Sequence, residues 1–376
     1  MHGSSISLFT LIEGLKRRNI CISLIVPSNW HKDQRFIDKA EELGITLHYA
    51  HLVHTCDRDG WSRRPWRLRT FYQELKELAH QRRESYQQIC KIIEQESPDI
   101  VHTNVGIIHD GYWAAKKYKI PHVFHIREFQ DKDFGWQILP TKWLFKLFLI
   151  RSSAVICIAD SIKKHFRLDH AKNATTIYNG IYSENSLCKI HNKHSYFLFA
   201  SRVSPEKDPE DIIKTFGEFH KKHIGWQLKI AGYCEPEYLN KLLELAKQYN
   251  CENAVMFLGH VNNIPELMQS ARALIVASYN EGFGRMSAEA AFNGCLIIGR
   301  NSAGTKEIID KVGGYRFENN KELLTAMTSA AHLSESEYSA QAIISQQKAA
   351  TIFSIEQNIQ NTIDIYNRCL KRCTCI

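Results

Sequence analysis

Short apolar segments typical of buried strands alternate with amphipathic helical segments along most of this 376-residue chain. In the first half, strands are expected at residues 21–26, 45–50, 99–103, 122–125 and 154–158, with a long polar helix at 70–95. A second alternating set runs from Tyr196 to about Phe317. Because this alternation is typical of parallel strands connected by helices, we predict an α/β protein with doubly wound sheets.

The chain is long enough for two domains of ordinary size. The polar stretch at residues 183–194 is the best candidate for a linker between them. We therefore predict a first domain over residues 1–182, a second over 195–352 and a C-terminal helical segment over 353–376.

The first set of elements opens with a helix instead of a strand. Gly3 starts a short turn that leads directly into a segment with Leu8, Leu11 and Leu15 on one helical face. A doubly wound domain should open with a strand, so we expect the first domain to lack its opening strand. Two neighbouring strands would then have exposed edges. Either a start codon assigned too late or a truncated product would produce this pattern.

A glycine turn flanked by two glutamates follows the predicted strand at residues 273–278. Gly282 and Gly284 let backbone N–H groups approach an anion, and the helix that follows adds its positive N-terminal end. Glu281 lies at the mouth of this turn, and Glu289 lies about 7.5 Å along the helix. The run therefore predicts a phosphate cradle beside groups that carry hydroxyls. The alternative is an ordinary turn with two solvated glutamates.

Two basic residues follow the strand that opens the second set. Arg202 and Lys207 are five positions apart in the loop after this strand. Arg as a fork and Lys as a point charge can both neutralise a diphosphate. Alone, such residues are more often solvated, but beside a glycine cradle we interpret them as diphosphate ligands.

These segments, in this order, resemble a known family. The glutamate pair Glu281 and Glu289 resembles the E-x7-E signature of the retaining glycosyltransferases of family 4, which have the GT-B fold. Further stretches that match the family are residues 197–207, 228–232, 257–261 and 301–307. The resemblance covers most of the chain and is strongest between about residues 195 and 310.

The resemblance implies two Rossmann-like domains that face a cleft, with a C-terminal helix that crosses back to the first domain. It implies a nucleotide-sugar donor bound mainly by the second domain, and transfer with retention to an acceptor hydroxyl. Arg202 and Lys207 would hold the diphosphate, Glu281 the sugar and Glu289 the ribose. The donor-binding residues implied in this way are Gly3, Gly232, Gly259, Gly282, Phe283, Gly284, Glu289, Gly304 and Thr305.

The family also places a histidine at the end of a first-domain strand, where it faces the transferred sugar. We assign this role to His125, which makes it a catalytic candidate together with Glu281, Arg202 and Lys207. His122 is the alternative, although it lies at the start of the same strand.

Two Asp-x-Asp patterns raise the question of a metal. They are Asp57-Arg58-Asp59 and Asp131-Lys132-Asp133, and both resemble polar loops more than the ends of buried strands. In the other main glycosyltransferase fold, such a pair holds a divalent ion on the nucleotide. We therefore predict transfer without a metal and without a cofactor.

The net charge of +8 is compatible with an anionic partner. The basic residues are dispersed and no nucleic-acid module is recognisable, so we expect no nucleic-acid partner. An aromatic and basic stretch between Trp136 and Arg151 could contact a membrane surface, although a helix packed on the core is the more common explanation. No apolar run of membrane-spanning length and no secretory signal is recognisable, and the cysteines show no metal-type spacing.

We therefore expect a cytoplasmic enzyme, either free or at the inner face of the membrane. Its acceptor would be a surface glycan or a lipid-linked glycan, as in the biosynthesis of lipopolysaccharide or another polysaccharide. Two alternatives remain open. One is another GT-B activity, such as a sugar-nucleotide epimerase or a glycan phosphorylase. The other is a non-catalytic sugar-nucleotide-binding remnant. Neither the nucleotide nor the sugar can be read from these residues.

Overall fold

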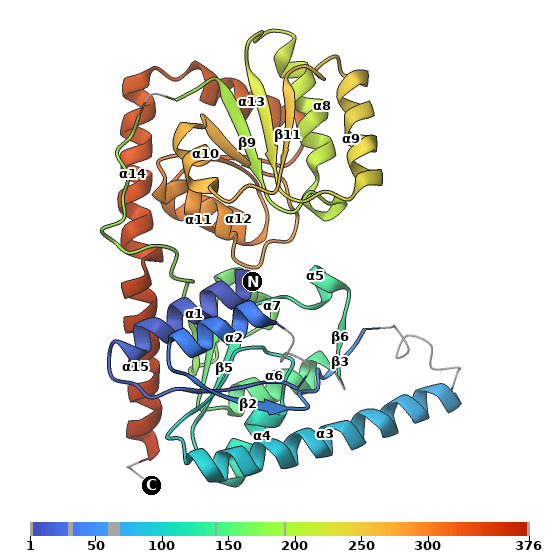
Figure 1. Cartoon of the computed structure of the whole chain (residues 1–376), viewed down its shortest axis with the longest axis vertical. Coiled ribbons are helices and arrows are strands. Elements are labelled where there is room, and N and C mark those ends of the chain that lie inside the picture. Colours follow the sequence, from blue (N-terminus) through green and yellow to red (C-terminus); the bar gives the residue numbers. More distant parts are fainter. Residues whose placement is uncertain (1–2, 29–32, 59–67, 140, 192, 374–376) are drawn as a thin grey trace. The chain divides into compact units, whose positions relative to one another are not determined.

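The computed structural model describes residues 3–28, 33–58, 68–139, 141–191 and 193–373. The chain divides into two compact units (Figure 1). Unit 1 comprises Met1–Gly180 and Ile355–Ile376, and unit 2 comprises Ile181–Ser354. The chain therefore passes between the units twice, after Gly180 and again after Ser354.

Unit 1 contains the following elements: α1 (Gly3–Lys16), β1 (Ser23–Pro27), α2 (Gln34–Glu42), β2 (Thr46–Ala50), β3 (Cys56–Asp57), α3 (Leu68–Glu96), β4 (Val101–Thr103), α4 (Asp110–Lys117), β5 (His122–Ile126), α5 (Asp131–Phe134), β6 (Gln137–Ile138), α6 (Lys142–Arg151), β7 (Ala154–Cys157), α7 (Asp160–His165), β8 (Ala174–Thr176) and α15 (Ile355–Cys373). The five predicted strands correspond to β1, β2, β4, β5 and β7, and the predicted long helix corresponds to α3.

The parallel strands of unit 1 form two separate sheets, β1-β2 and β4-β5-β7-β8. Every residue of β5 and β7 is buried, whereas β4 is only partly buried along its length and so is most of β1. Among the described residues no strand precedes α1, and β1 and β4 are edge strands. This is the arrangement expected above for a doubly wound sheet without its opening strand.

Unit 2 contains the following elements: β9 (Tyr196–Ala200), the 3-10 helix η3 (Pro205–Lys207), α8 (Pro209–His220), β10 (Gln227–Ala231), α9 (Pro236–Gln248), β11 (Val255–Gly259), α10 (Ile264–Ser270), β12 (Ala273–Val276), α11 (Arg285–Phe292), β13 (Leu296–Arg300), α12 (Ala303–Val312), β14 (Tyr315–Phe317), α13 (Asn320–His332) and α14 (Glu335–Phe353). Local sequence sets several of the helix starts. Proline opens α8 and α9, and Ser334 with Glu337 forms a capping box at α14.

The six strands of unit 2 form one parallel sheet in the order β11-β10-β9-β12-β13-β14. Numbered within the unit, this is the Rossmann order 3-2-1-4-5-6. The order reverses between β9 and β12. In such sheets, ligands bind beyond the carboxyl ends of the strands at this reversal. The fold therefore predicts that ligand-binding residues lie in the loops that follow β9 and β12.

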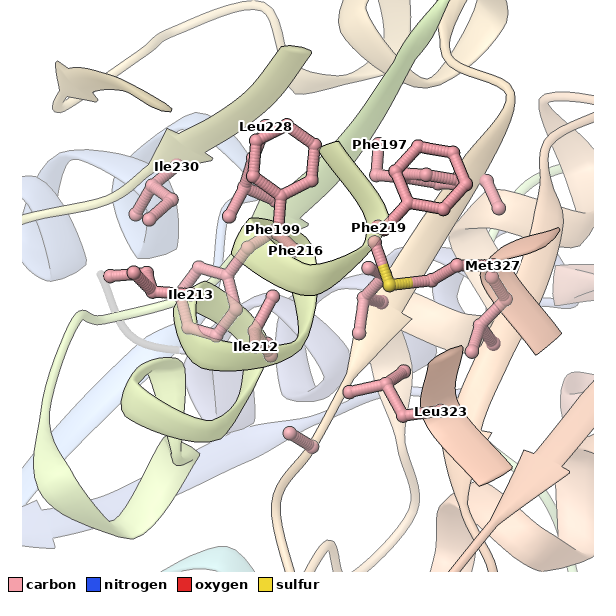
Figure 2. Close-up of a cluster of buried hydrophobic side chains, with 14 of the residues drawn as sticks. Phe197, Phe199, Ile212, Ile213, Phe216, Phe219, Leu228, Ile230, Leu323 and Met327 are labelled. Carbon is pink, nitrogen blue, oxygen red and sulfur yellow. The ribbon is translucent and has the colours of Figure 1, made fainter. Parts of the chain in front are cut away.

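The main core of unit 2 lies between this sheet and the helices α8, α9 and α13. Figure 2 shows Phe216 and Phe219 of α8 among Phe197 and Phe199 of β9, with Met327 of α13 beside them. β9 is apolar throughout and every one of its residues is buried, as expected for a central strand covered on both faces.

Residues 183–194, for which a linker is predicted above, lie within unit 2. The Cys188 carbonyl accepts a hydrogen bond from Gln346 Nε2 at 2.9 Å, and Lys193 Nζ donates to the Gln269 carbonyl at 2.5 Å. The polar composition of this segment therefore reflects surface packing along α14 and α10. The C-terminal helix α15 belongs to unit 1.

The described aspartates of the Asp-x-Asp patterns do not lie in polar loops, contrary to the prediction. Asp57 is buried in β3, which pairs antiparallel with β6. Asp59 lies outside the described residues. Asp131 and Asp133 lie in the single turn of α5, where Asp131 forms an ion pair with Lys142 at 2.9 Å. Within the described part of the chain, no group of three His, Cys, Asp or Glu residues is placed to hold a metal ion.

Truncating a core side chain tests this packing. Phe216 is fully buried, so we expect Phe216→Ala to lower the free energy of unfolding by about 3–5 kcal/mol. Ile224 is 87% exposed in the same unit, so Ile224→Ala should change it by less than about 0.5 kcal/mol. Urea denaturation followed by circular dichroism measures both values. Equal effects of the two substitutions would contradict this description of the core.

Candidate functional site

Two of the predicted site residues meet where the strand order reverses. Lys207 ends η3, which follows β9, and Glu281 lies in the loop that follows β12. Lys207 Nζ contacts Glu281 Oε1 at 2.5 Å, and both side chains are partly buried. The fold thus brings together two residues 74 positions apart in the sequence.

The starts of α11 and α12 lie next to each other beside this pair. Gly284 precedes α11 with a φ of +84°, which favours glycine, and a Cβ on it would lie 3.3 Å from the Thr305 nitrogen. The backbone N–H groups of Gly284, Met286 and Thr305 have no acceptor among the described residues. Unbonded N–H groups at two neighbouring helix N-termini form a place where an anion is favoured.

Gly304 joins the start of α12 to the loop after β12. Its N–H donates to the Glu281 carbonyl at 2.8 Å. A Cβ on Gly304 would lie 2.5 Å from the Phe283 carbonyl oxygen, closer than real Cβ contacts allow. Ser302 Oγ also donates to the Tyr279 carbonyl at 2.6 Å. Gly304 is therefore required for the close approach of two backbone segments, and its N–H is already bonded within the protein.

Glu289 is the fifth residue of α11 and is buried. Its Oε1 accepts a hydrogen bond from Arg285 Nε at 2.7 Å. Burial raises the pKa of Glu289, and Arg285 lowers it to a smaller extent. We did not predict Arg285 as a site residue. The spacing of four between the two residues on one helix was a signal for their pairing.

The remaining predicted residues of unit 2 occupy different environments. Arg202 is exposed and paired with Glu206. Gly232 has a φ of +146°, and a Cβ on it would collide with the Ser201 carbonyl. Gly259 has a φ of +62° and open space around it, and Gly282 is partly exposed.

Two predicted residues beside the cradle are buried. Phe283 packs edge-on against Phe353, with ring centroids 5.7 Å apart. Thr305 is fully buried, and its Oγ1 has no partner among the described residues.

Arg300, at the end of β13, anchors the loops around the site and was not predicted. It is buried and bonds Asp208 at 2.5 Å and the Ala277 carbonyl at 2.6 Å. Its guanidinium also lies 3.9 Å from the centre of the Tyr279 ring. One side chain thus connects the loops after β9 and β12. No local pattern marks this role, because its partners come from other strands.

In unit 1, His125 lies near the end of β5 and is only 1% exposed. Its Nδ1 contacts His102 Nε2 at 3.2 Å, and its buried Nε2 has no partner among the described residues. Burial lowers the pKa of His125 well below its usual range, with a further contribution from Arg127, so the ring is neutral. The alternative candidate, His122, contacts Thr103 Oγ1 at 2.8 Å at the start of β5.

Arg127, which follows β5, is buried and bonded on two sides. Its Nε donates to Asn104 Oδ1 and its Nη1 to Asn179 Oδ1, each at 2.8 Å. Asn179 stands just before the point where the chain leaves unit 1. Gly3 is the first residue of α1, and its predicted donor contact stays a prediction.

The aromatic and basic stretch forms α6. Phe145 and Leu149 pack into the core, as the more common explanation predicts, whereas Trp143 remains 68% exposed. No helix among the described residues is long and apolar enough to cross a membrane.

The titration of Glu289 can be tested through stability. A carboxylate whose pKa is raised by folding contributes stability below the ordinary value of 4.5, and this contribution is lost as the pH rises through the folded pKa. Glu289→Gln removes this titration. We therefore expect the unfolding free energy of the wild type minus that of the variant to fall as the pH rises above about 4.5 in urea denaturation. The exposed Glu244 on α9 supplies a matched control, Glu244→Gln. A difference that rises with pH would contradict the burial argument.

The family model described as "Glycosyltransferase Family 4" matches residues 1–185, and the model described as "Glycosyl transferases group 1" matches residues 188–348. A glycogen synthase of Mycobacterium tuberculosis is 26% identical over 227 residues, which cover 56% of this chain and 54% of that protein. The chain thus spans about half the length of this curated relative.

Solved structures agree with this assignment at the level of fold. Anabaena HepE in complex with UDP superposes with a TM-score of 0.75 at 18% identity, covering 97% of this chain and 96% of HepE. A glycosyltransferase from Rickettsia africae gives a TM-score of 0.77 at 16% identity, covering 99% of this chain and 96% of that protein. The two family matches together extend over both units, and the chain therefore belongs to the group 1 glycosyltransferases of the GT-B fold.

Proposed function

We propose that this protein is a retaining glycosyltransferase that moves a sugar from a nucleotide diphosphate to an acceptor hydroxyl. The observation that carries the proposal is the Lys207–Glu281 pair beside the unbonded N–H groups of α11 and α12. A cation and two helix N-termini suit a diphosphate, and a carboxylate suits the hydroxyls of a sugar. HepE, which shares this fold, has been solved with UDP, which supports a nucleotide diphosphate as the ligand.

In the proposed reaction the bond between the anomeric carbon and the diphosphate oxygen breaks. An acceptor hydroxyl forms the new glycosidic bond on the same face of the sugar, and its proton leaves with the diphosphate. Lys207 and the N–H groups stabilise the negative charge that develops on the leaving group. Arg202, which is exposed and pairs with an exposed glutamate, can turn toward the same charge. This stabilisation needs no metal, so we propose metal-independent transfer.

The other predicted residues retain their proposed roles. Glu289, held by Arg285, would accept hydrogen bonds from the ribose hydroxyls, which would favour its ionised form. Because Glu289 is buried, hydrogen bonds from ribose would add to the one from Arg285 in stabilising its charge. His125 would bond a hydroxyl of the transferred sugar through its unpartnered Nε2.

We propose a surface glycan or a lipid-linked glycan as the acceptor, used at the cytoplasmic face of the membrane. Trp143 is exposed on α6 next to Lys142, and an exposed aromatic residue with a neighbouring cation suits an anionic lipid interface. The buried side of α6 packs on the core, so the contact would involve this exposed side only.

Binding of UDP tests the donor site directly. Loss of a charge-assisted hydrogen bond costs about 1.5–3 kcal/mol, so Lys207→Ala should weaken UDP binding by about tenfold to a hundredfold in calorimetry. Lys241, which pairs with Glu210 at 2.9 Å elsewhere in unit 2, provides the matched control Lys241→Ala. Equal affinities in the two variants would remove Lys207 from the site.

Turnover tests the reaction itself. We expect labelled sugar from one of a panel of sugar nucleotides to appear on lipid-linked glycan from a membrane extract. Glu281→Ala should reduce this transfer about a hundredfold or more, because Glu281 contacts the sugar in the proposed complex. Proton NMR of the product should show the anomeric configuration of the donor.

Three results would count against the proposed function or its site. Epimerised nucleotide sugar formed without acceptor would indicate an epimerase. UDP binding without transfer to any acceptor would indicate a binding protein. Unchanged transfer by Glu281→Ala would reject the site assignment.

A further inference from the structure

A chain of three hydrogen-bonding side chains ends at His125 in unit 1. Tyr366 Oη contacts His102 Nδ1 at 2.6 Å, and His102 Nε2 contacts His125 Nδ1 at 3.2 Å. Tyr366 belongs to α15, His102 to β4 and His125 to β5. This series of hydrogen bonds thus joins the C-terminal helix to His125, which is proposed to bind substrate.

The position of Tyr366 is set by its own helix. The neighbouring Ile365 and Cys369 are buried against the sheet together with Val123 of β5 and Ile156 of β7. The Tyr366 ring meets the His102 ring edge-on, at an angle of 88° between the ring planes. The hydroxyl group is therefore held in place by core packing.

Both histidines are neutral, so each ring carries one N–H. Burial lowers the pKa of His102 to about 3 and also lowers that of His125, and Arg127 adds to both effects. A neutral ring donates from one nitrogen and accepts at the other. The direction of one hydrogen bond in the chain therefore determines the direction of the next, and only two arrangements are possible.

Tyr366 distinguishes the two arrangements. If His102 Nδ1 donated to Tyr366, the hydroxyl hydrogen of Tyr366 would have no acceptor among the described residues, because His102 is its single hydrogen-bond partner there. If Tyr366 donates to His102 Nδ1, every hydrogen in the chain has an acceptor as far as His125. The first arrangement leaves two groups unpaired, the Tyr366 hydroxyl hydrogen and the acceptor His125 Nε2, whereas the second leaves only the His125 Nε2–H unpaired. Each unpaired buried polar group is costly, so the second arrangement is favoured.

We infer that Tyr366, acting through His102, holds His125 as the tautomer that carries its hydrogen on Nε2. In this form His102 Nε2–H donates to His125 Nδ1, and His125 presents an N–H donor at the buried position that has no protein partner. Tyr366 and His102 are then positioning residues, which fix the hydrogen-bonding character of His125 without contacting a ligand.

The chemistry of the matching ligand follows from this arrangement. An Nε2–H group requires an oxygen acceptor, such as the oxygen of a sugar hydroxyl, and it disfavours a group that can only donate. This part of the inference rests on the proposed function, in which His125 meets the transferred sugar. It predicts that a sugar whose hydroxyl at this position is replaced by an amino group is a poor substrate when that amine is protonated.

Long-range proton–nitrogen correlation NMR on the full-length protein, with 15N-labelled histidine, reads the tautomers directly. His125→Asn and His102→Asn identify the two signals. In the wild type we expect both rings to be protonated at Nε2. In Tyr366→Phe the bias should be lost, because one hydrogen bond accounts for about a fivefold preference, and the His125 signal should show a mixture of tautomers.

Tyr118→Phe is the matched control, because Tyr118 loses a hydrogen bond to Glu94 in the same unit, away from the histidines. A wild-type His125 protonated at Nδ1 would overturn the inference without any variant. So would a His125 tautomer that Tyr366→Phe leaves unchanged. If wild-type protein turns over no sugar nucleotide, the proposed function fails while the tautomer result stands.

Activity supplies a second readout. Tyr366→Phe should lower kcat for sugar transfer and leave the affinity for UDP unchanged, because UDP has no transferred sugar. A loss of UDP affinity equal to the loss in kcat would indicate general damage to the fold, and it would contradict a positioning role for Tyr366.

Discussion

The candidate site of unit 2 depends on the close approach of two backbone segments at Gly304. Its N–H bonds the Glu281 carbonyl, and the Phe283 carbonyl occupies the space that a side chain on Gly304 would need. This contact holds the loop after β12 against the start of α12. As a result, Glu281 lies beside Lys207, and the N-termini of α11 and α12 lie side by side. The geometry of the proposed phosphate site therefore arises from backbone packing, and the charged side chains lie on a loop that is already held in place.

Buried charged residues hold the surrounding loops in position. Arg300 connects Asp208 with the Ala277 carbonyl, and Arg285 satisfies Glu289. Removing one partner from either of these ion pairs would leave the other charge buried without compensation. This costs more stability than the ion pair itself contributes. Unit 1 uses neutral groups for a comparable purpose. Its buried histidines are uncharged, and a tyrosine sets the direction of their hydrogen bonds.

Most of the fold could be predicted from local patterns. The strands β5, β7 and β9 are short apolar runs, and α3 is a long amphipathic segment, so period and composition identify them. The position of polar segments in the fold was harder to predict. Residues 183–194 have the composition of a linker but pack within unit 2, because hydrogen bonds from Gln346 and Lys193 fasten them there. Asp57 resembles a loop residue but is buried in β3, because its partner strand lies about eighty residues later in the chain.

The sequence by itself determined the type of sheet, the glycine cradle and the charged residues that make a nucleotide sugar the expected donor. These features are local, since each depends on residues within a single strand, turn and helix. Only the tertiary structure decided which groups meet. The pairing of Lys207 with Glu281, the anchor at Arg300 and the chain from Tyr366 to His125 join residues that are far apart in sequence. Such contacts follow from the order of strands in a sheet and the packing of helices on it, and no local pattern encodes that order.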